Sequence, residues 1–226
     1  LHLEEARQFE VITGVSRKPK QEGLTCGDSY SFTSVKDGKY LLALSDGMGF
    51  GAKAAEESSA VISLLENFLE AGFDQNITIK TINSILMLRS REEMFATADL
   101  CIIDLVGAGA DFIKIGGVPS FIRRHDKVEI IQQPALPMGI LEEVQLENIS
   151  VPIYDEDMII MVTDGILDAF SLMGDEQKSL ASFIATLDTT NPQELSDSIM
   201  EEAMFHMDGE ARDDMTVMAG RIWKPY

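Results

Sequence analysis

A predicted β-hairpin restricts the fold of this chain more than any other feature. Two apolar runs, Tyr30–Val35 and Tyr40–Ser45, flank an Asp37-Gly38 pair, which is a strong signal for a tight hairpin turn. We therefore expect the two runs to pair as antiparallel strands. Because Asp28 precedes the first run and Asp46 follows the second, we expect both carboxylates at the same end of the sheet.

Apolar periodicity predicts the remaining elements. Helices are predicted over 52–71, 78–88, 177–186 and 192–206. Strands are predicted over 9–16, 98–106, 111–115, 120–124, 128–132, 146–151, 158–163 and 215–222. Turn-like segments join the strands between residues 98 and 132, so we expect an antiparallel meander there.

Composition limits the class of protein. The chain has 226 residues, 45% of them hydrophobic, which suffices for one large domain. Its formal charge of −20 argues against nucleic acid as a partner, because phosphates would be repelled. Cys26 and Cys101 lack C-x-x-C spacing, so we expect reduced, non-catalytic thiols.

The domain organisation is expected to be simple. No internal linker or repeat is visible, so we expect a single domain over residues 9–226, with residues 1–8 as the end of an upstream linker or regulatory helix. No apolar run reaches the roughly 18 residues of a membrane-spanning helix. We therefore expect a cytoplasmic domain without membrane contact of its own, in a protein whose membrane anchor could lie upstream of Leu1.

Four acidic positions recur beside predicted strand ends, namely Asp28, Asp46-Gly47, Asp164-Gly165 and Asp213-Asp214. Taken alone, Asp46-Gly47 is better explained as an ordinary strand-to-helix turn. Gathered together, carboxylates raise one another's pKa and are stable only with a cation or shared protons. Oxygen ligands without His or Cys suit magnesium, manganese or calcium. Two such ions can activate a water and clamp a phosphoryl oxygen, so no nucleophilic side chain is required.

Other catalytic motifs are absent or weak. The sequence has no G-x-S-x-G and no G-x-x-x-x-G-K-[ST], which excludes the usual serine-hydrolase and P-loop patterns. The glycines of Gly47–Gly51 have the wrong spacing for a dinucleotide fingerprint. The histidines are scattered over a terminus, a turn and a helix.

The ordered acidic motifs resemble those of metal-dependent (PPM, type 2C) serine/threonine phosphatases. The matching segments are Gly27–Ser29, Ser45–Gly49, Thr163–Ile166 and Asp213–Thr216. The resemblance covers nearly the whole chain. Two further segments, Phe112–Phe121 and Asn191–Asp197, resemble the phosphatase domain of the stage II sporulation protein E family. The related stress-response phosphatases that act on anti-anti-sigma factors stay open as an alternative.

The resemblance implies an α+β fold, a four-layer α-β-β-α sandwich of two antiparallel sheets flanked by helix pairs. It also implies two divalent cations, Mn²⁺ or Mg²⁺. Asp46 would bridge them, and the Gly47 carbonyl would bind the second ion. Asp164 and Asp213 would hold the first ion, with Asp28 near the second, directly or through water.

Several positions depart from the eukaryotic pattern. Gly23 stands near the place of the phosphate-gripping arginine, so either Arg17, Lys18 or Lys20 takes over that role or the metals hold the phosphate alone. Gly27 replaces a glutamate. The loop that brings a third metal in some relatives is not evident. Asp214 replaces an asparagine, and its role is open. Asp168 matches an acidic position of the family or, equally, has a helix-start role.

The function implied by the resemblance is a metal-dependent protein serine phosphatase that uses metal-activated water and forms no phosphoenzyme. Its substrate would be a phosphorylated anti-anti-sigma factor, whose dephosphorylation releases a sporulation sigma factor. We also expect a homodimer, or an upstream regulatory segment, in contact with the helices 52–71 and 78–88. Two alternatives are an inactive phosphatase fold kept as a binding module and a calcium-stabilised structural domain, although no calcium-loop spacing is present.

Overall fold

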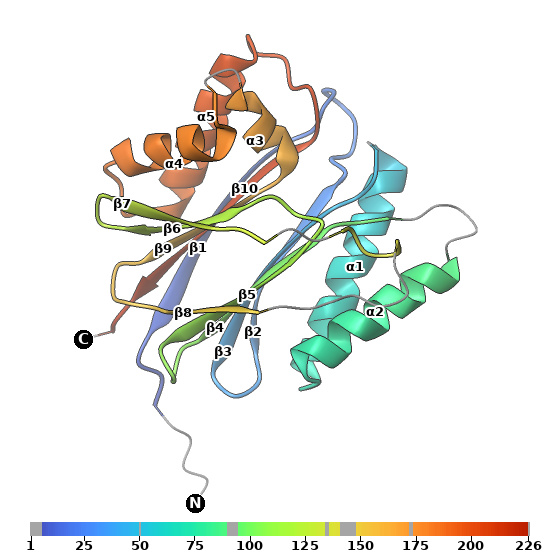
Figure 1. The fold of residues 1–226 in the computed structure, drawn as a ribbon, viewed down its shortest axis with the longest axis vertical. Coiled ribbons are helices and arrows are strands. Elements are labelled where there is room, and N and C mark those ends of the chain that lie inside the picture. The colour runs from blue at the N-terminus through green and yellow to red at the C-terminus, as the bar shows by residue number, and fades with distance from the viewer. Residues whose placement is uncertain are drawn as a thin grey trace, which may run out of the picture.

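Two antiparallel five-stranded sheets pack face to face at the centre of the molecule, and helices cover the outer face of each (Figure 1). The computed structural model describes residues 6–49, 51–89, 95–133, 136–140, 148–171 and 174–225. This arrangement confirms the predicted α+β, four-layer α-β-β-α sandwich.

The two sheets draw their strands from distant parts of the chain. The first has the order β1 (Glu10–Lys18), β10 (Met215–Trp223), β9 (Met158–Val162), β6 (Ser120–Arg124) and β7 (Lys127–Ile131). The second has the order β2 (Asp28–Val35), β3 (Lys39–Asp46), β4 (Ala98–Asp104), β5 (Gly109–Ile115) and β8 (Ile149–Pro152). The predicted hairpin is confirmed as β2 and β3.

The predicted meander is wrong, because β4 and β5 belong to the second sheet while β6 and β7 belong to the first. The chain changes sheets at Gly116–Pro119. Gly116 has a φ of +72°, and a Cβ atom there would lie 2.6 Å from the Cα of Pro137, so only glycine fits. Apolar runs cannot reveal this crossing, since β5 and β6 each pair with a strand that comes later in the chain, β8 and β9 respectively.

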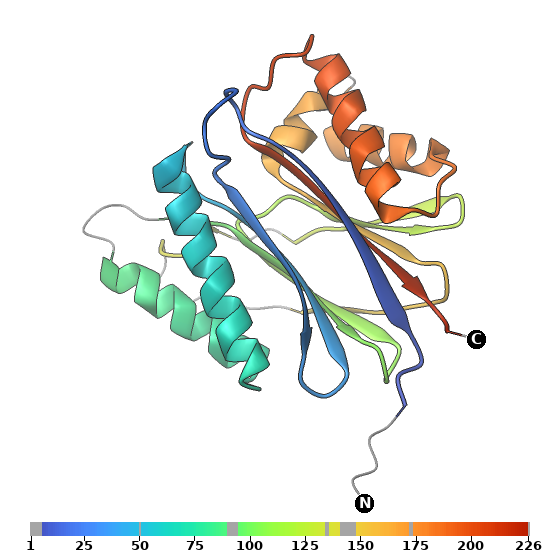
Figure 2. The same cartoon turned by 180° about the vertical axis from the view of Figure 1, so that it is seen from behind.

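Helices α1 (Ala52–Glu70) and α2 (Gln75–Arg89) cover the second sheet. The first sheet is covered by α3 (Asp164–Ala169), α4 (Glu176–Thr186) and α5 (Pro192–His206), as Figure 2 shows from behind. The four predicted helices are confirmed. The six-residue α3 was missed because it is shorter than the roughly 10 residues that a periodicity signal needs.

Three apolar layers hold these elements together. Leu42, Phe112 and Met218 are buried between the two sheets. Leu65 lies in the layer beneath α1 and α2, and Leu180 lies in the layer beneath α3, α4 and α5. Each sheet is thus apolar on both faces, which explains why its central strands read as continuous apolar runs.

The described residues contain neither a membrane-spanning helix nor a regular element before β1. None of the described helices is long and apolar enough to cross a membrane. Residues 1–5 lie outside the described part, and residues 6–8 form neither helix nor strand. The role expected for residues 1–8 therefore stays a prediction.

Strand register gathers the acidic motifs at one edge of the sandwich. Asp28 lies opposite Asp46 in the β2–β3 pair, as predicted. Val162 of β9 lies opposite Val217 of β10, and the pairing continues outward through the Thr163 N–H, which donates to the Thr216 carbonyl at 3.1 Å. The two motifs that follow β9 and precede β10 therefore meet.

Candidate metal centre

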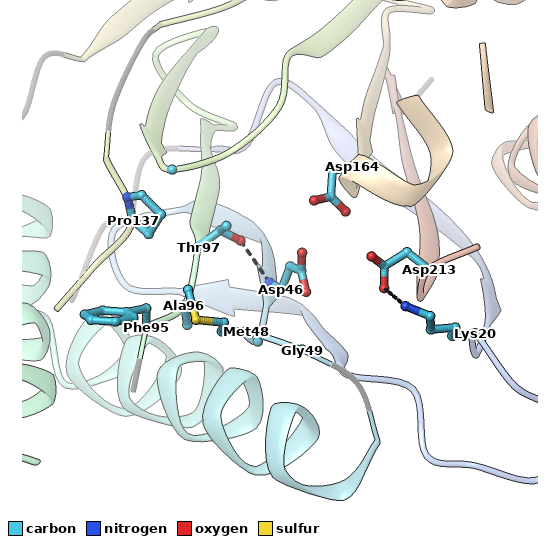
Figure 3. Close-up of a pocket in the computed structure, with 12 residues that line it drawn as sticks. Lys20, Asp46, Met48, Gly49, Phe95, Ala96, Thr97, Pro137, Asp164 and Asp213 are labelled. Atoms are coloured by element: carbon cyan, nitrogen blue, oxygen red, sulfur yellow. Dashed lines mark hydrogen bonds and ion pairs between the residues drawn. The ribbon is translucent and has the colours of Figure 1, made fainter. Parts of the chain in front are cut away.

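Three of the predicted acidic residues line one open pocket of about 300 Å³. Asp46 is the last residue of β3, Asp164 is the first residue of α3, and Asp213 lies just before β10. Figure 3 shows their carboxylates directed toward the same space, with Lys20 at its edge. The pocket thus joins side chains from both sheets at the edge where their strands end.

Asp28 lies behind this pocket. The residue is 1% exposed, and its Oδ2 accepts hydrogen bonds from the hydroxyls of Thr163, at 3.0 Å, and Thr216, at 2.6 Å. Its Oδ1 is buried without a hydrogen-bond partner among the described residues. A buried carboxylate oxygen left in this way is costly, which fits a site that a cation or an ordered water completes.

The electrostatics of the site also favour a bound cation. Burial, followed by the charges of Asp28, Asp164 and Asp213, raises the pKa of Asp46 to about 9. Burial is also the main cause that raises the pKa of Asp28 to about 6, although its two threonine hydrogen bonds act in the opposite direction. Burial of the carboxyl group, then the charge of Asp213, raises the pKa of Asp164, although the residue as a whole is exposed. Without a cation, Asp46 therefore keeps its proton at neutral pH, and the cluster favours the protonated form of Asp28 and Asp164 more than water does.

The side chains alone do not form a closed cage. Across the described residues, no three His, Cys, Asp or Glu side chains stand close enough together to enclose one ion. Mg²⁺ is usually bound by one or two carboxylates and keeps several waters, so an open site with few direct ligands suits it. The donor set therefore fits a hydrated hard cation better than a fully protein-coordinated one.

Gly47 is fixed between the second sheet and α1. A Cβ atom at this position would lie 2.0 Å from the carbonyl oxygen of Ala54, in the first turn of α1, so no other residue fits. On the opposite side, the Asp46 N–H donates to the Thr97 hydroxyl, and the Thr97 N–H donates to the Asp46 carbonyl, both at 2.9 Å. The position of Asp46-Gly47 is therefore tied to the position of α1.

Asp214, whose role the sequence left open, holds the loop between β1 and β2. Its Oδ1 accepts the backbone N–H of Lys20, and its Oδ2 accepts that of Gly27, both at 2.8 Å. A Cβ atom on Gly27 would lie 2.8 Å from the same Oδ2, which explains why glycine replaces the glutamate of the eukaryotic pattern. Asp214 is 3% exposed and does not line the pocket of the other aspartates.

The three basic candidates, two at the end of β1 and one in the loop that follows it, have different positions. Lys20 lines the pocket, and its Nζ lies 3.9 Å from Asp213 Oδ1. The Arg17 guanidinium donates to the backbone carbonyl of Asp28 and stacks on Tyr30, 5.3 Å from the ring centre, so it supports the site from behind. Lys18 lines a neighbouring groove instead.

Asp168 does not begin a helix, so the helix-start reading is wrong. It is the next-to-last residue of α3, one turn after Asp164, and its side chain is exposed. Its charge contributes to the raised pKa of Asp164. A carboxylate near a helix C-terminus gains nothing from the helix dipole.

A buried ion pair beside the site was missed. Lys114 Nζ lies 3.0 Å from Asp99 Oδ2 and donates to the Val118 carbonyl at 2.8 Å, with both charged residues less than 5% exposed. Asp99 lines a cavity of about 70 Å³ together with Asp46 and Asp164. The signal was present, because Asp99 and Lys114 stand opposite each other in neighbouring apolar strands.

Comparison with known proteins agrees with this geometry. The sequence model of the family described as Stage II sporulation protein E matches residues 36–223. Stage II sporulation protein E of Priestia megaterium is 43% identical over 216 residues, which cover 96% of this chain and 37% of that protein. The phosphoserine phosphatase RsbP of Bacillus subtilis (strain 168) is 20% identical over 147 residues, or 63% of this chain and 36% of RsbP. The chain thus spans well under half the length of these relatives.

Solved structures give the same result. The PP2C phosphatase domain, with a fragment of the regulatory domain, of the cell fate determinant SpoIIE from Bacillus subtilis superposes with a TM-score of 0.92. It is 42% identical, over 98% of this chain and 65% of that chain. RsbX in complex with magnesium shares the fold, with a TM-score of 0.71 and 20% identity, over 96% of this chain and all of the other. The predicted PPM, or PP2C-type, phosphatase resemblance is confirmed.

Proposed function

The chain belongs to the stage II sporulation protein E family, and from this premise we propose that it is a divalent-metal-dependent protein phosphatase that hydrolyses phosphoserine. One observation carries the proposal: three carboxylates from both sheets line one pocket, and the pKa of two of them is raised. The chain spans only 37% of the length of its Priestia megaterium relative, so the activity of that whole protein comes to this chain as a proposal.

The proposed ligands are those expected from the motifs. Asp46 would bridge two ions, the Gly47 carbonyl would bind the second, and Asp164 and Asp213 would bind the first. Some of these contacts would run through water, since no three of the described acidic side chains stand close enough together to enclose one ion. Asp28 would act next to the second ion through its unpartnered Oδ1, since Oδ2 is taken by two threonine hydroxyls. The metal is proposed as Mn²⁺ or Mg²⁺, for which the magnesium complex of RsbX gives support by analogy.

When bound, such ions lower the pKa of a water ligand and neutralise charge on phosphoryl oxygens. The chain itself would orient the phosphate: Lys20, at the edge of the pocket, offers a cation to a phosphate oxygen. Cys26 is a poor nucleophile, because burial, followed by the charge of Asp28, raises the pKa of its thiol. These features support hydrolysis without a phosphoenzyme.

We propose a phosphorylated anti-anti-sigma factor as the substrate, so that dephosphorylation releases a sporulation sigma factor. The identity of 43% to a sporulation protein, against 20% to RsbP, favours sporulation over the stress response. That RsbP is a phosphoserine phosphatase supports phosphoserine as the substrate residue.

We further propose that α1 and α2 are the regulatory face, covered by a second copy of the chain or by an upstream segment. Any displacement of α1 would move Gly47, which contacts Ala54. Large apolar side chains on and beside α2 are exposed, including Phe73 at 52%, Ile77 at 58% and Leu88 at 86%. If two copies of the chain assemble through this face, the manganese concentration for half-maximal activity should fall as protein concentration rises.

Hydrolysis of p-nitrophenyl phosphate with manganese, magnesium or calcium tests the proposed activity. We expect turnover with manganese or magnesium and its loss in Asp164→Ala, while the exposed control Asp126→Ala keeps the parent rate. An inactive binding module would bind the phosphoprotein without turnover, and a structural calcium domain would be stabilised by calcium alone. Either result would refute the proposal.

A further inference from the structure

A groove of about 760 Å³ lies beside the metal centre, between two loops that are far apart in the sequence. One of them, residues 18–22, begins at the last residue of β1, and the other, residues 209–212, precedes β10. They lie side by side because Lys18 pairs with Met215 in the β1–β10 ladder (Figure 2). The volume is within the range of about 300–1,000 Å³ that is typical of ligand pockets.

The groove and the pocket of the metal centre share a wall. Lys20 lines both, and its Nζ lies 3.9 Å from Asp213. The remaining lining of the groove comes from outside the acidic cluster. A molecule with its phosphoryl group in the metal centre can therefore extend past Lys20 into the groove.

The shape of the groove is preformed. Asp214 accepts the backbone N–H groups of Lys20 and Gly27 at 2.8 Å each, so a buried carboxylate anchors the first loop to the start of β10. The Lys18 carbonyl is also within 3.9 Å of the Cys26 sulfur, on the same loop. A preformed surface loses less conformational entropy when a flexible segment binds.

The charge of the groove differs from that of the whole chain. Three basic side chains line it, from Lys18, Lys20 and Arg212, against two acidic ones, from Glu22 and Glu210. The chain as a whole carries a net charge of −20. A negatively charged substrate is repelled by most of such a surface, so a local excess of cations next to the reaction site favours its approach there.

We propose that this groove binds an acidic segment next to the phosphoserine of the protein substrate. Carboxylates of that segment would pair with Lys18 and Arg212, while Lys20 lies between the segment and the phosphate. The inference rests on the proposed phosphatase function and adds a specificity site to it. The groove contributes to recognition of the substrate segment and takes no part in the chemical step.

Two phosphoserine peptides test the proposal. They are identical except that three glutamates beside the phosphoserine are replaced by glutamine in the second, and p-nitrophenyl phosphate serves as the substrate without a flanking segment. For the parent, we expect kcat/KM to be roughly three- to tenfold higher for the acidic peptide. Each ion pair at an exposed rim is expected to contribute about two- to fivefold, and the preference should shrink as salt screens it.

Charge reversal locates the effect. Lys18→Glu and Arg212→Glu should each lower the preference for the acidic peptide toward one, with kcat/KM compared against p-nitrophenyl phosphate for the same variant. Lys127→Glu is the matched control, because Lys127 is exposed at the β6–β7 turn and does not line the groove. The control should retain the parent preference.

Peptide binding, measured by fluorescence anisotropy of the labelled acidic peptide, separates this inference from the proposed function. A parent that binds the acidic peptide better than the neutral one, but turns over no substrate, supports the groove and refutes the phosphatase. A parent that hydrolyses p-nitrophenyl phosphate without preferring the acidic peptide refutes the groove. Equal preference in Lys18→Glu, Arg212→Glu and Lys127→Glu also refutes it.

Discussion

Replacement of Asp46 by asparagine should stabilise the metal-free protein, and the effect should depend on pH. Asparagine keeps the shape of the side chain and can donate a hydrogen bond to Asp28, its neighbour across the β2–β3 ladder. It removes the charge that the cluster disfavours. The folded state holds the Asp46 proton to a pKa of about 9, whereas an unfolded aspartate has a pKa of about 3.9.

The direction in which pH changes the stability of the parent follows from this difference in proton affinity. Between those two values the folded state binds more protons than the unfolded state, so the parent loses stability as the pH rises. At pH 7 the full shift corresponds to an upper limit of about 4 kcal/mol. Asp46 is partly open to solvent, which screens its interactions, so we expect roughly 1–3 kcal/mol. For a domain of this size, that range corresponds to a rise in Tm on the order of 5 °C.

Thermal unfolding in EDTA at pH 5 and pH 8 measures the effect. The variant should unfold at a higher temperature than the parent at pH 8, and the difference should shrink at pH 5. Added manganese should then reverse the order. At a hundredfold excess over Kd, a ligand stabilises the native state by about 2.7 kcal/mol, which only the intact site would gain in full.

The control is Asp126→Asn, which removes a carboxylate from an exposed turn and should change neither the EDTA result nor the manganese shift. Two results would show that the reasoning is wrong. One is a lower Tm for Asp46→Asn than for the parent at pH 8 in EDTA. The other is an equal manganese shift in parent and variant, because the cation would then bind elsewhere.

Three further predictions address the groups around the site. Gly47→Ala should raise the manganese concentration for half-maximal activity at least tenfold, because its Cβ would lie 2.0 Å from the Ala54 carbonyl oxygen and displace α1. The control Gly109→Ala, whose Cβ would have its nearest contact at 3.8 Å, should leave that manganese concentration unchanged. Asp99→Ala should lower the free energy of unfolding, measured in urea, by about 3–5 kcal/mol, because it leaves Lys114 buried and without its ion pair. The double change Asp99→Leu/Lys114→Met should recover most of this loss, because it removes both charges. Cys26→Ala should keep most activity, since the pKa of the thiol is raised, and rapid quench should trap no phosphorylated enzyme; a phospho-cysteine would contradict this.

The sequence alone determined the local elements of this fold and the edge at which its acidic residues gather. The Asp37-Gly38 turn set the register of β2 and β3, which places Asp28 opposite Asp46. Helical periodicity identified the four longer helices. These features depend on residues that are close in the sequence, and turn chemistry and side-chain periodicity encode them directly.

Only the tertiary structure decided how distant segments meet. The separation of β5 from β6 depends on their pairing with β8 and β9, strands that come later in the chain and that no local pattern specifies as partners. The hydrogen bonds of Asp28 to Thr163 and Thr216 span 135 and 188 positions, and they move Asp28 behind the pocket that Asp46, Asp164 and Asp213 line. The motifs left the role of Asp214 open, and the structure shows that its hydrogen bonds reach back across 194 and 187 positions to Lys20 and Gly27. The motifs therefore specify which carboxylates reach the site, whereas long-range packing and buried hydrogen bonds determine which of them line the pocket and which hold its walls in place.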